Sequence, residues 1–420
     1  MTEEEATPTP EPTQADTFDI DLPDIPLPSQ AEDAGINDKF PSSVAFKYAF
    51  CGSGQGGSRL AESFYKLGYR RVVAINTALQ DLDALDLPQQ NKLEIATGGA
   101  GKNPLVAQKH IQRHREDVYD LMARQFGDTF DRLFVLIGGG GGTGSGSVST
   151  LVETAHELLK ALHIENEDSG VTKAPKVGVI CTLPMVSESR QVNGNAYQVL
   201  QKLLSWSATE DGKYADPKHA ISPLVIVDNE RVKKIYPQIA VTEFWEAANR
   251  SITSLFHVFN VLAEQPTRFT VFDKNDLDDV LSSGLVTFGA TPVKPGSDTI
   301  DRTDISYAIR DNVQRNVLSD GLDLRTGSRA ACIVVGNKSI LNVVPQEALE
   351  HGFEQLTRIM QPHSVVHRGI YTSIRPGLAI YTMLGGLAPP KDRLKLLRNL
   401  GNQPASDSWD LSGNRDGNPS

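Results

Sequence analysis

A run of glycines, broken by one threonine and one serine, occupies residues 138–146. The apolar stretch 133–137 precedes it, and a helix-like pattern over 149–154 follows it. A strand that ends in glycines and restarts as a helix presents bare backbone N–H groups and the positive end of a helix dipole, which together bind phosphate. A flexible linker is the alternative, but linkers are rarely bounded by a buried strand and an apolar-periodic helix. We therefore interpret the run as a phosphate-binding loop, to which the hydroxyls of Thr143 and Ser145 add donors.

Another glycine loop, the first along the chain, carries the pattern G-x-G-x-x-G, with Gly52, Gly54 and Gly57 at the fixed positions. This pattern suggests a dinucleotide-binding site, which also needs an acid at the end of the second strand to hold the ribose. Here the second strand ends in Asn76 and Thr77. A nicotinamide cofactor is therefore the weaker interpretation.

A third glycine segment, residues 98–104, contains Gly101-Lys102 and partly resembles a P-loop. Ala96 stands where the first glycine of a P-loop belongs, and Asn103 stands where a serine or threonine would bind magnesium. The segment is not a Walker site, and an ordinary loop in which Pro104 opens a helix is the alternative.

Strand-like apolar runs alternate with helical patterns before and after these loops. The runs are residues 44–50, 71–75, 133–137, 177–181 and 224–227. Such alternation predicts an α/β fold with a parallel sheet covered by helices. Ligands bind at the carboxyl ends of the strands in such sheets, so we expect the loops to converge on one site.

The remaining patterns predict a long helix over 241–264 and then further strands and helices. Strands are expected at 285–288, 330–335 and 378–382, with helices at about 304–319 and 346–360. We expect a disordered acidic, proline-rich arm at 1–40, a nucleotide-binding domain at 41–240, a central linking helix at 241–265, a second smaller α/β domain at 266–388 and a flexible tail at 389–420. Within the arm, residues 18–27 alternate apolar and acidic side chains, which predicts either a short docking motif or a featureless tail.

Composition limits the class of protein. The 420 residues are enough for two domains, and 41 Lys and Arg against 52 Asp and Glu give a net charge of −11, which argues against direct nucleic-acid binding. The three cysteines, Cys51, Cys181 and Cys332, lack metal-ligand spacing and fit a reducing compartment. No apolar stretch approaches the ~18 residues of a transmembrane segment, and we expect a cytoplasmic protein.

The three glycine loops and the Asn76-Thr77 turn, in this order, resemble the tubulin/FtsZ family of polymerising GTPases over roughly residues 44–388. Residues 140–146 match the signature loop of that family, Gly-Gly-Gly-Thr-Gly-Ser/Thr-Gly, without a mismatch. The resemblance implies a Rossmann-like parallel-sheet GTPase domain and, as cofactors, GTP or GDP with Mg²⁺. No protein residue is assigned as a metal ligand.

The resemblance also implies which residues bind the nucleotide. The signature loop would hold the α- and β-phosphates through Gly140, Gly141, Gly142, Thr143, Gly144 and Ser145. The first loop would help to hold the diphosphate, and the residues expected there are Gly52, Ser53, Gly54, Gln55, Gly56 and Ser58, with Asn76. The third loop would sense the γ-phosphate through Gly99, Ala100, Gly101, Lys102 and Asn103. Glu188 and Arg190 would lie at the ribose, and Asn229 and Asn249 would read guanine, although both asparagines also fit ordinary turn or helix positions.

The resemblance further implies that hydrolysis requires a neighbouring subunit. Residues 272–280 resemble the family's catalytic Asn-x-Asp-x-x-Asp loop, in which Asp276 and Asp279 match the two acids. They would orient the attacking water and help position Mg²⁺ at the next subunit's GTP; a helix N-terminus with favourable acidic charge is the alternative. Lys274 replaces the asparagine, with Asn275 adjacent, and Ala78 replaces an acid that often follows the Asn-Thr turn. A head-to-tail contact of this kind does not close, so it generates filaments with the chain itself as partner.

The sequence therefore predicts a cytoskeletal GTPase that polymerises and hydrolyses GTP at the subunit interface. A GTP-binding paralogue with little hydrolysis is the alternative, and a Rossmann NAD-dependent enzyme is a weaker one. Division proteins of the family usually end in an Asp-Ile-Pro-x-Phe-Leu peptide, whereas the nearest string here is Asp24 to Leu27 in the arm. An adaptor that binds a terminal tail and roles in cell division, DNA segregation or a phage cytoskeleton stay open.

Overall fold

The computed structural model describes residues 43–402, apart from 97, 167, 172, 209–211, 236–240, 295–299 and 375. The arm at 1–40, including its motif at 18–27, and the tail beyond residue 402 lie outside the described residues.

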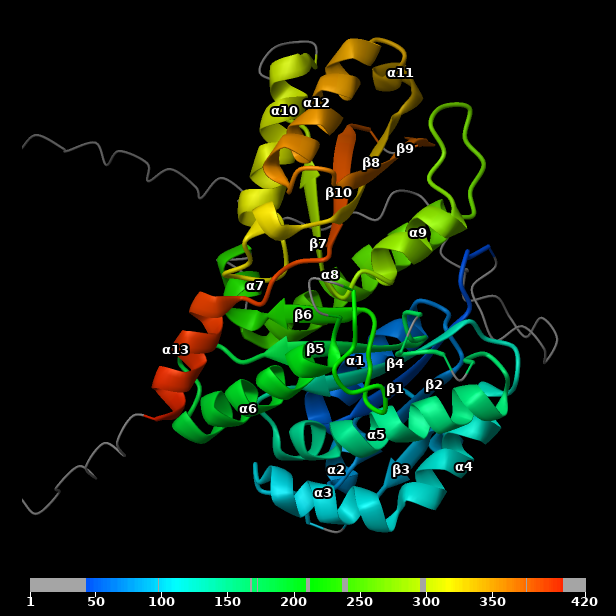
Figure 1. Ribbon diagram of the computed structural model, residues 1–420, viewed down its shortest axis with the longest axis vertical. Coiled ribbons are helices and arrows are strands. Elements are labelled where there is room, and N and C mark those ends of the chain that lie inside the picture. The colour runs from blue at the N-terminus through cyan, green and yellow to red at the C-terminus, as the bar shows by residue number, and fades with distance from the viewer. Residues whose placement is uncertain are drawn as a thin grey trace, which may run out of the picture.

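The described strands form one ten-stranded sheet in the order β3-β2-β1-β4-β5-β6-β7-β10-β8-β9 (Figure 1). The first six are parallel throughout, and their bounds are β1 Tyr48–Ser53, β2 Val72–Asn76, β3 Lys92–Glu94, β4 Arg132–Gly138, β5 Val177–Leu183 and β6 Leu224–Asp228. The predicted parallel sheet is thus confirmed. Most of these strands extend one or two residues beyond the apolar runs, up to the polar ends that carry the loops.

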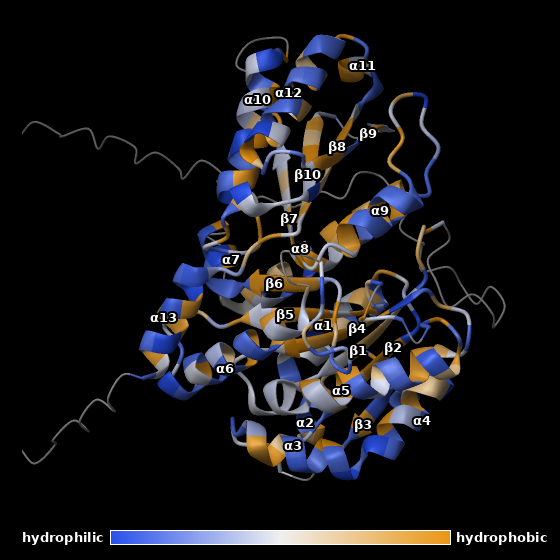
Figure 2. Cartoon of the chain, in the orientation of Figure 1, coloured by the Kyte–Doolittle hydropathy of each residue, from blue (hydrophilic) through white to orange (hydrophobic). Residues whose placement is uncertain are grey.

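Helices cover both faces of this sheet. In the first half they are α1 Gly54–Lys66, α2 Leu79–Asp83, α3 Pro104–Arg113, α4 Arg115–Phe126, α5 Gly142–Ala161, α6 Arg190–Trp206 and α7 Asn229–Ile235, with a short 3-10 turn at Gln89–Asn91. Successive strand residues point to opposite faces, so Val135 packs into the core beneath α5 and Phe134 packs into the core beneath α1 and α8. Figure 2 shows the apolar strands between helices whose outer faces are hydrophilic.

The long helix α8, Val241–Leu262, leads into the second half, which continues the same sheet. Its elements are α9 Lys274–Leu281, β7 Leu285–Pro292, α10 Arg302–Asp311, a π turn at Asn312–Asn316, a 3-10 turn at Leu324–Thr326, β8 Arg329–Asn337, α11 Lys338–Leu341, α12 Gln346–Ile359, β9 Val365–Ser373 and β10 Leu378–Gly385. β7 pairs with β6 through only Leu224–Leu285 and Val225–Val286, and β10 runs antiparallel between β7 and β8. The second half is therefore joined to the first through a short stretch of ladder and the buried helix α8.

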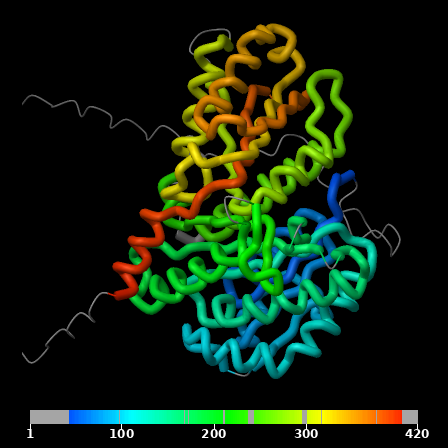
Figure 3. The backbone as a smooth tube through the Cα atoms, in the orientation of Figure 1, coloured from blue at the N-terminus to red at the C-terminus, as the bar shows by residue number. Residues whose placement is uncertain are grey.

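The segment predicted as a flexible tail begins differently. Residues Lys391–Gly401 form helix α13, which packs along α6, as the red C-terminal helix in Figure 3 shows. Arg393 and Leu397 of this helix are buried. Only a polar composition was visible in the sequence, because the partners of these two side chains lie far away along the chain. Among the described residues, no helix is both long and apolar enough to cross a membrane.

Candidate functional site

A cavity of about 460 Å³ opens where five parallel strands end. The residues at or just after these ends are Ser53, Asn76, Gly138, Thr182 and Asn229, and all of them line it. The predicted binding residues that line it are Ser53, Gly54, Gln55, Gly56, Asn76, Gly99, Ala100, Gly101, Lys102, Gly140, Gly141, Gly142, Thr143, Gly144, Glu188, Asn229 and Asn249. The three glycine loops therefore converge on one space, as the position of ligands in parallel α/β sheets leads one to expect.

The signature loop ends where helix α5 begins at Gly142. A Cβ atom at Gly142 would lie 2.8 Å from the backbone nitrogen of Asn103, so only glycine lets the signature loop and the third loop approach this closely. The Thr143 hydroxyl lies at the cavity and is 2.8 Å from the Thr77 hydroxyl. The Ser145 hydroxyl instead donates to the Gly139 carbonyl at 2.6 Å, so it closes the loop and does not line the cavity.

The first loop leads from β1 directly into α1. Gly54 has a left-handed φ of +69°, and a Cβ there would lie 3.0 Å from the backbone nitrogen of Gly144. Gly52 and Ser58 do not line the cavity. Gly52 packs against Gly57, because a Cβ atom on Gly52 would lie 2.4 Å from the Gly57 carbonyl oxygen. Ser58 is buried and lies on α1 behind the loop. These two residues shape the loop from behind.

The third loop is held by backbone geometry. Gly99, Gly101 and Lys102 all have left-handed φ values, and the Lys102 carbonyl accepts hydrogen bonds from Gln191 at 2.9 Å and Asn195 at 2.8 Å, both on α6. Asn103 does not line the cavity, because its side chain caps α3 by accepting from the Leu105 nitrogen at 3.0 Å.

An acid that was not among the predicted residues lies at the phosphate-loop end of the cavity. Asp81, on α2, accepts hydrogen bonds from Asn76 at 3.0 Å and from Gln55 at 3.2 Å, and all three side chains line the cavity. The sequence suggested that an acid was missing at Ala78. Asp81 lies three residues further on, about one helical turn away, and this spacing is the signal that could have identified it.

The opposite end of the cavity is formed by the residues expected at the ribose and the base. Glu188, Asn229 and Asn249 line it together with Trp245, which lies one turn before Asn249 on α8 and is 38% exposed. Arg190, the first residue of α6, is exposed and is not among the lining residues. Trp245 was overlooked because a single aromatic residue on a long amphipathic helix reads as part of the core.

Two loops at this end are joined beneath the cavity. The Glu230 carboxylate accepts from the Val186 nitrogen at 3.0 Å. Arg393 of α13 forms a bidentate, buried ion pair with Asp228 at 2.7 and 2.9 Å, and it also donates to the Pro184 carbonyl at 2.5 Å. Burial raises the pKa of Asp228, and Arg393 opposes this shift. The C-terminal helix thus braces the strand end that precedes Asn229.

Asp276 and Asp279 lie on α9 and are not at the cavity of their own chain. Asp276 completes a capping box, because its carboxylate accepts from the Asp273 nitrogen at 3.1 Å while Asp273 caps the helix. The alternative interpretation, that these acids stabilise a helix N-terminus, is therefore correct for part of the role of Asp276. Both carboxylates also contact His367 of β9, at 2.8 and 2.9 Å.

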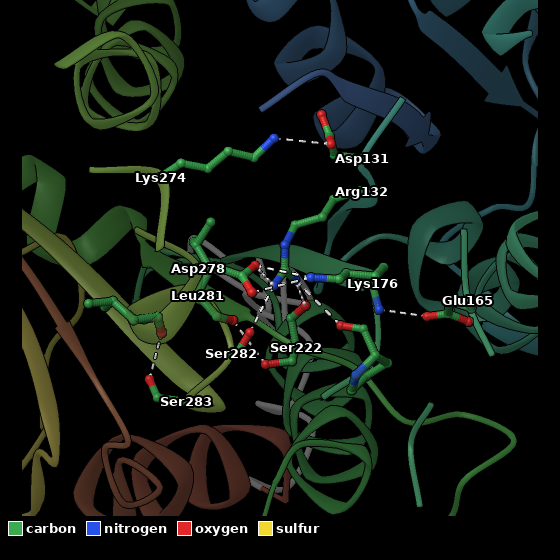
Figure 4. Close-up of polar contacts among 12 residues, drawn as sticks. Asp131, Arg132, Glu165, Lys176, Ser222, Lys274, Asp278, Leu281, Ser282 and Ser283 are labelled. Carbon is green, nitrogen blue, oxygen red and sulfur yellow. Dashed lines mark hydrogen bonds and ion pairs between the residues drawn. The ribbon is translucent and has the colours of Figure 1, made fainter. Parts of the chain in front are cut away.

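Lys274, which stands where the catalytic loop was expected to have an asparagine, contacts the first half of the chain. Its ammonium group lies 3.3 Å from Asp131 (Figure 4). It also lies 4.5 Å from the ring centre of Phe46, and both partners belong to the first half of the chain. The neighbouring Asn275 donates its backbone N–H to Asp273 at 2.7 Å. Lys274 therefore holds the start of α9 against its own nucleotide-binding half.

No family model matches the chain. The chain is 23% identical over 300 residues to the tubulin-like protein TubZ of Bacillus cereus. This match covers 66% of the chain and 62% of TubZ, so the chain spans somewhat less than two thirds of that relative. It is 21% identical over 355 residues to the cell division protein FtsZ 1 of Pyrococcus furiosus, with 83% of this chain and 82% of that protein covered.

Among solved structures, the fold is similar to that of a crystallised GTPγS-form protofilament of TubZ from Bacillus thuringiensis serovar israelensis. The TM-score is 0.71 at 17% sequence identity, and the match covers 86% of this chain and 92% of that one. At this identity the likeness concerns the fold.

Proposed function

We propose that this chain, which is tubulin/FtsZ-like in sequence and in fold, binds GTP in the cavity at the strand ends, assembles head to tail into filaments and hydrolyses GTP at the contact between subunits. One observation carries the proposal. The phosphate-type loops converge on a cavity that lacks the two acids of the catalytic motif, and those acids lie on α9 in the other half of the chain. A second copy completes the site.

The phosphates would be held mainly by backbone N–H groups. The loops at Gly54 and at 140–144 lie against each other, and α5 begins inside the second of them, so its dipole adds positive potential. Close packing of glycine backbones leaves no room for side chains there. This arrangement suits a ligand whose negative charge is spread over several oxygens.

The base would lie at the other end, between Asn229 and Asn249. A side-chain amide offers one acceptor and two donors, which can pair with the donor and acceptor edge of guanine. Trp245 is placed to stack on the base, and Glu188 is placed to accept from ribose hydroxyls. GTP and GDP are therefore the proposed ligands.

Magnesium would bind at the phosphate end. Within the described residues, no group of three His, Cys, Asp or Glu side chains converges as a metal site. Mg²⁺ usually binds through one or two carboxylates together with substrate phosphates, and Asp81 is an acid in that position. A carboxylate beside a triphosphate is repelled unless a cation lies between them, so the position of Asp81 fits the ion. When bound, Mg²⁺ would neutralise phosphate charge.

Hydrolysis would use Asp276 and Asp279 of the neighbouring subunit. Their carboxylates would hold the attacking water in line with the γ-phosphate and accept its proton as the bond forms. TubZ and FtsZ are among the relatives of this chain, and the similar TubZ structure is a protofilament. The contact would be heterologous and repeating, which generates a filament.

A GTP-binding protein with little turnover is the second candidate. This candidate is favoured by the ion pairs that residues of the catalytic motif form within their own chain. Lys274 pairs with Asp131, and Asp276 and Asp279 pair with His367. The cytoplasmic location that we propose rests on three free, buried cysteines, which fit a reducing compartment. An adaptor that binds a terminal tail stays a proposal without structural support.

The deciding experiment is sedimentation with GTP, GDP and a non-hydrolysable analogue, together with phosphate release measured against protein concentration. Polymer that forms with GTP, and turnover per molecule that falls on dilution, are expected from a site shared between subunits. Turnover that stays constant on dilution contradicts the shared site. Polymer with GTP but negligible phosphate release selects the low-turnover candidate, and tight binding of NAD in place of GTP overturns both.

A further inference from the structure

We propose that His367 is a positioning residue for hydrolysis: its ring holds Asp276 and Asp279 in one arrangement where they meet the next subunit's triphosphate. This inference rests on the proposed function. It concerns a residue of β9, the edge strand of the sheet, which the sequence did not predict (Figure 1).

The geometry is that of a ring held between two carboxylates. Nδ1 of His367 lies 2.8 Å from Oδ1 of Asp276, and Nε2 lies 2.9 Å from Oδ2 of Asp279. The two aspartates are three residues apart on one helix, so their side chains project from the same face. A single ring therefore fixes the spacing between the two acids.

The two contacts differ in kind. Nε2 of His367 is hydrogen-bonded to Oδ2 of Asp279, whereas Nδ1 faces Oδ1 of Asp276 at ion-pair distance. Each nitrogen of the ring therefore contacts one of the two acids.

The charges of the cluster explain why this matters for assembly. Arg329 of β8 lies 2.8 Å from Oδ2 of Asp279, so two carboxylates face one guanidinium and one ring. Two acids that approach a triphosphate are repelled by it, and the Arg329 guanidinium reduces that repulsion.

The neighbours of His367 on β9 have other partners. Arg368, the next residue of β9, lies over the Phe353 ring of α12, so it faces the other side of the strand. Tyr371, on the same face as His367, has its hydroxyl hydrogen-bonded to the backbone of Phe272. The cluster itself joins His367 to Asp276 and Asp279 of α9, with Arg329 of β8 on Asp279.

The cluster is also accessible. The side chains of His367, Asp276 and Asp279 are 16%, 27% and 39% exposed, respectively. These values leave the acids open to a neighbouring subunit while the ring beneath them is largely covered. The ring is therefore placed to act through the acids and not on the nucleotide itself.

The test compares His367→Gln with wild type and with His363→Gln, which removes an exposed histidine a few residues upstream. GTP affinity, sedimented polymer and phosphate release per polymerised subunit are measured for each protein. Asp276→Asn and Asp279→Asn are measured in parallel.

We expect His363→Gln to behave as wild type does. His367→Gln should bind GTP and sediment as wild type does, but lose about tenfold or more in turnover per polymerised subunit. His367→Lys, whose ammonium group can donate to both carboxylates, should recover part of the turnover.

The outcomes separate this inference from the proposed function. If Asp276→Asn and Asp279→Asn abolish turnover while His367→Gln keeps the wild-type rate, the role of His367 is overturned and the shared site stands. If neither aspartate variant changes turnover, both ideas fail. Should His367→Gln not fold, His367→Asn replaces it, and a wild-type rate in that variant overturns the role of His367.

Discussion

The Arg132 guanidinium donates to the Asp278 carboxylate at 2.6 Å and so fastens α9 to the nucleotide-binding half of the chain (Figure 4). Arg132 is completely buried at the start of β4, and it also donates to the Ser282 hydroxyl at 2.8 Å and to the Ser222 carbonyl at 3.1 Å. Lys176 adds a second cation 3.1 Å from the same carboxylate. Asp278 is held by cations of the first half, while its neighbours Asp276 and Asp279 face β8 and β9. The helix that carries the proposed catalytic acids is thus fixed on both sides.

Replacing Asp278 with Asn should destabilise the fold, because it leaves the buried Arg132 charge without its partner. Breaking a fully buried pair costs about 3–5 kcal/mol, and the partial exposure of Asp278 lowers the expected loss to about 2 kcal/mol. Urea unfolding measures this change. Asp323→Asn, which removes the partner of Arg325 in an exposed pair, is the control and should leave the midpoint nearly unchanged. Equal midpoints for wild type and Asp278→Asn would contradict the anchor.

The same ion pair makes stability depend on pH. Burial alone would raise the pKa of Asp278, but Arg132 and then Lys176 outweigh it, so the pKa is lowered from its ordinary value. A carboxyl whose pKa is lower in the folded state stabilises the fold at pH values above its unfolded pKa, about 3.9, and this contribution is lost as the pH falls through the folded pKa. The difference in stability between wild type and Asp278→Asn should therefore be full at pH 6 and shrink in acid below about pH 4. A difference that grows on acidification refutes the assignment.

Local sequence patterns predicted the strands and the loops that meet at the cavity, because apolar runs and glycine clusters act over a few residues. They did not reveal the long-range side-chain pairs. Arg393 lies 165 residues from Asp228, and His367 lies 88 residues from Asp279, so no spacing along the chain marks either contact. The buried Arg393 lies in a polar segment that was read as a flexible tail. Asp81 was overlooked for a different reason, since the acid was sought at Ala78 and the helix supplies it one turn later.

The glycines of the first loop should differ sharply in their tolerance of alanine. A Cβ at Gly57 would lie 2.0 Å from the Leu136 carbonyl oxygen, whereas a Cβ at the neighbouring Gly56 would meet its nearest atom at an ordinary 3.5 Å. Gly57→Ala must push α1 away from β4, and we expect a loss of about 1–3 kcal/mol or more. Gly56→Ala should lie within about 1 kcal/mol of wild type. Thermal unfolding of the two variants checks the contrast, and similar losses in both would argue against this close helix–strand packing.

Asp81→Asn should change how GTP binding depends on magnesium. In the absence of Mg²⁺ the variant should bind GTP more tightly than wild type, because a negative charge beside the phosphates is gone. With Mg²⁺ present it should gain less affinity than wild type does, since one oxygen ligand has lost its charge. Titrations with a fluorescent GTP analogue in EDTA and in Mg²⁺ measure both effects. Asp83→Asn, an exposed acid on the same helix, is the control. The role of Asp81 is excluded by equal magnesium dependence in the variant and wild type.

Arg393→Met should weaken recognition of the base, although Arg393 does not line the cavity. Its bidentate pair with Asp228 and its bond to the Pro184 carbonyl hold the strand end before Asn229 and the loop that leads to Glu188. With methionine there, Asp228 keeps a buried carboxylate without a cation, and the turn that presents Asn229 can shift.

We expect about a tenfold loss in GTP affinity and a smaller preference for GTP over ITP, because Asn229 would meet the guanine edge less well. Competition titrations with the two nucleotides measure both quantities. Arg398→Met, an exposed arginine of the same helix, controls for the loss of a cation and should behave as wild type. Lower thermal stability of Arg393→Met with an unchanged ratio of GTP to ITP affinity would assign Arg393 to the packing of α13 alone, because a brace that positions the base site must alter discrimination between bases.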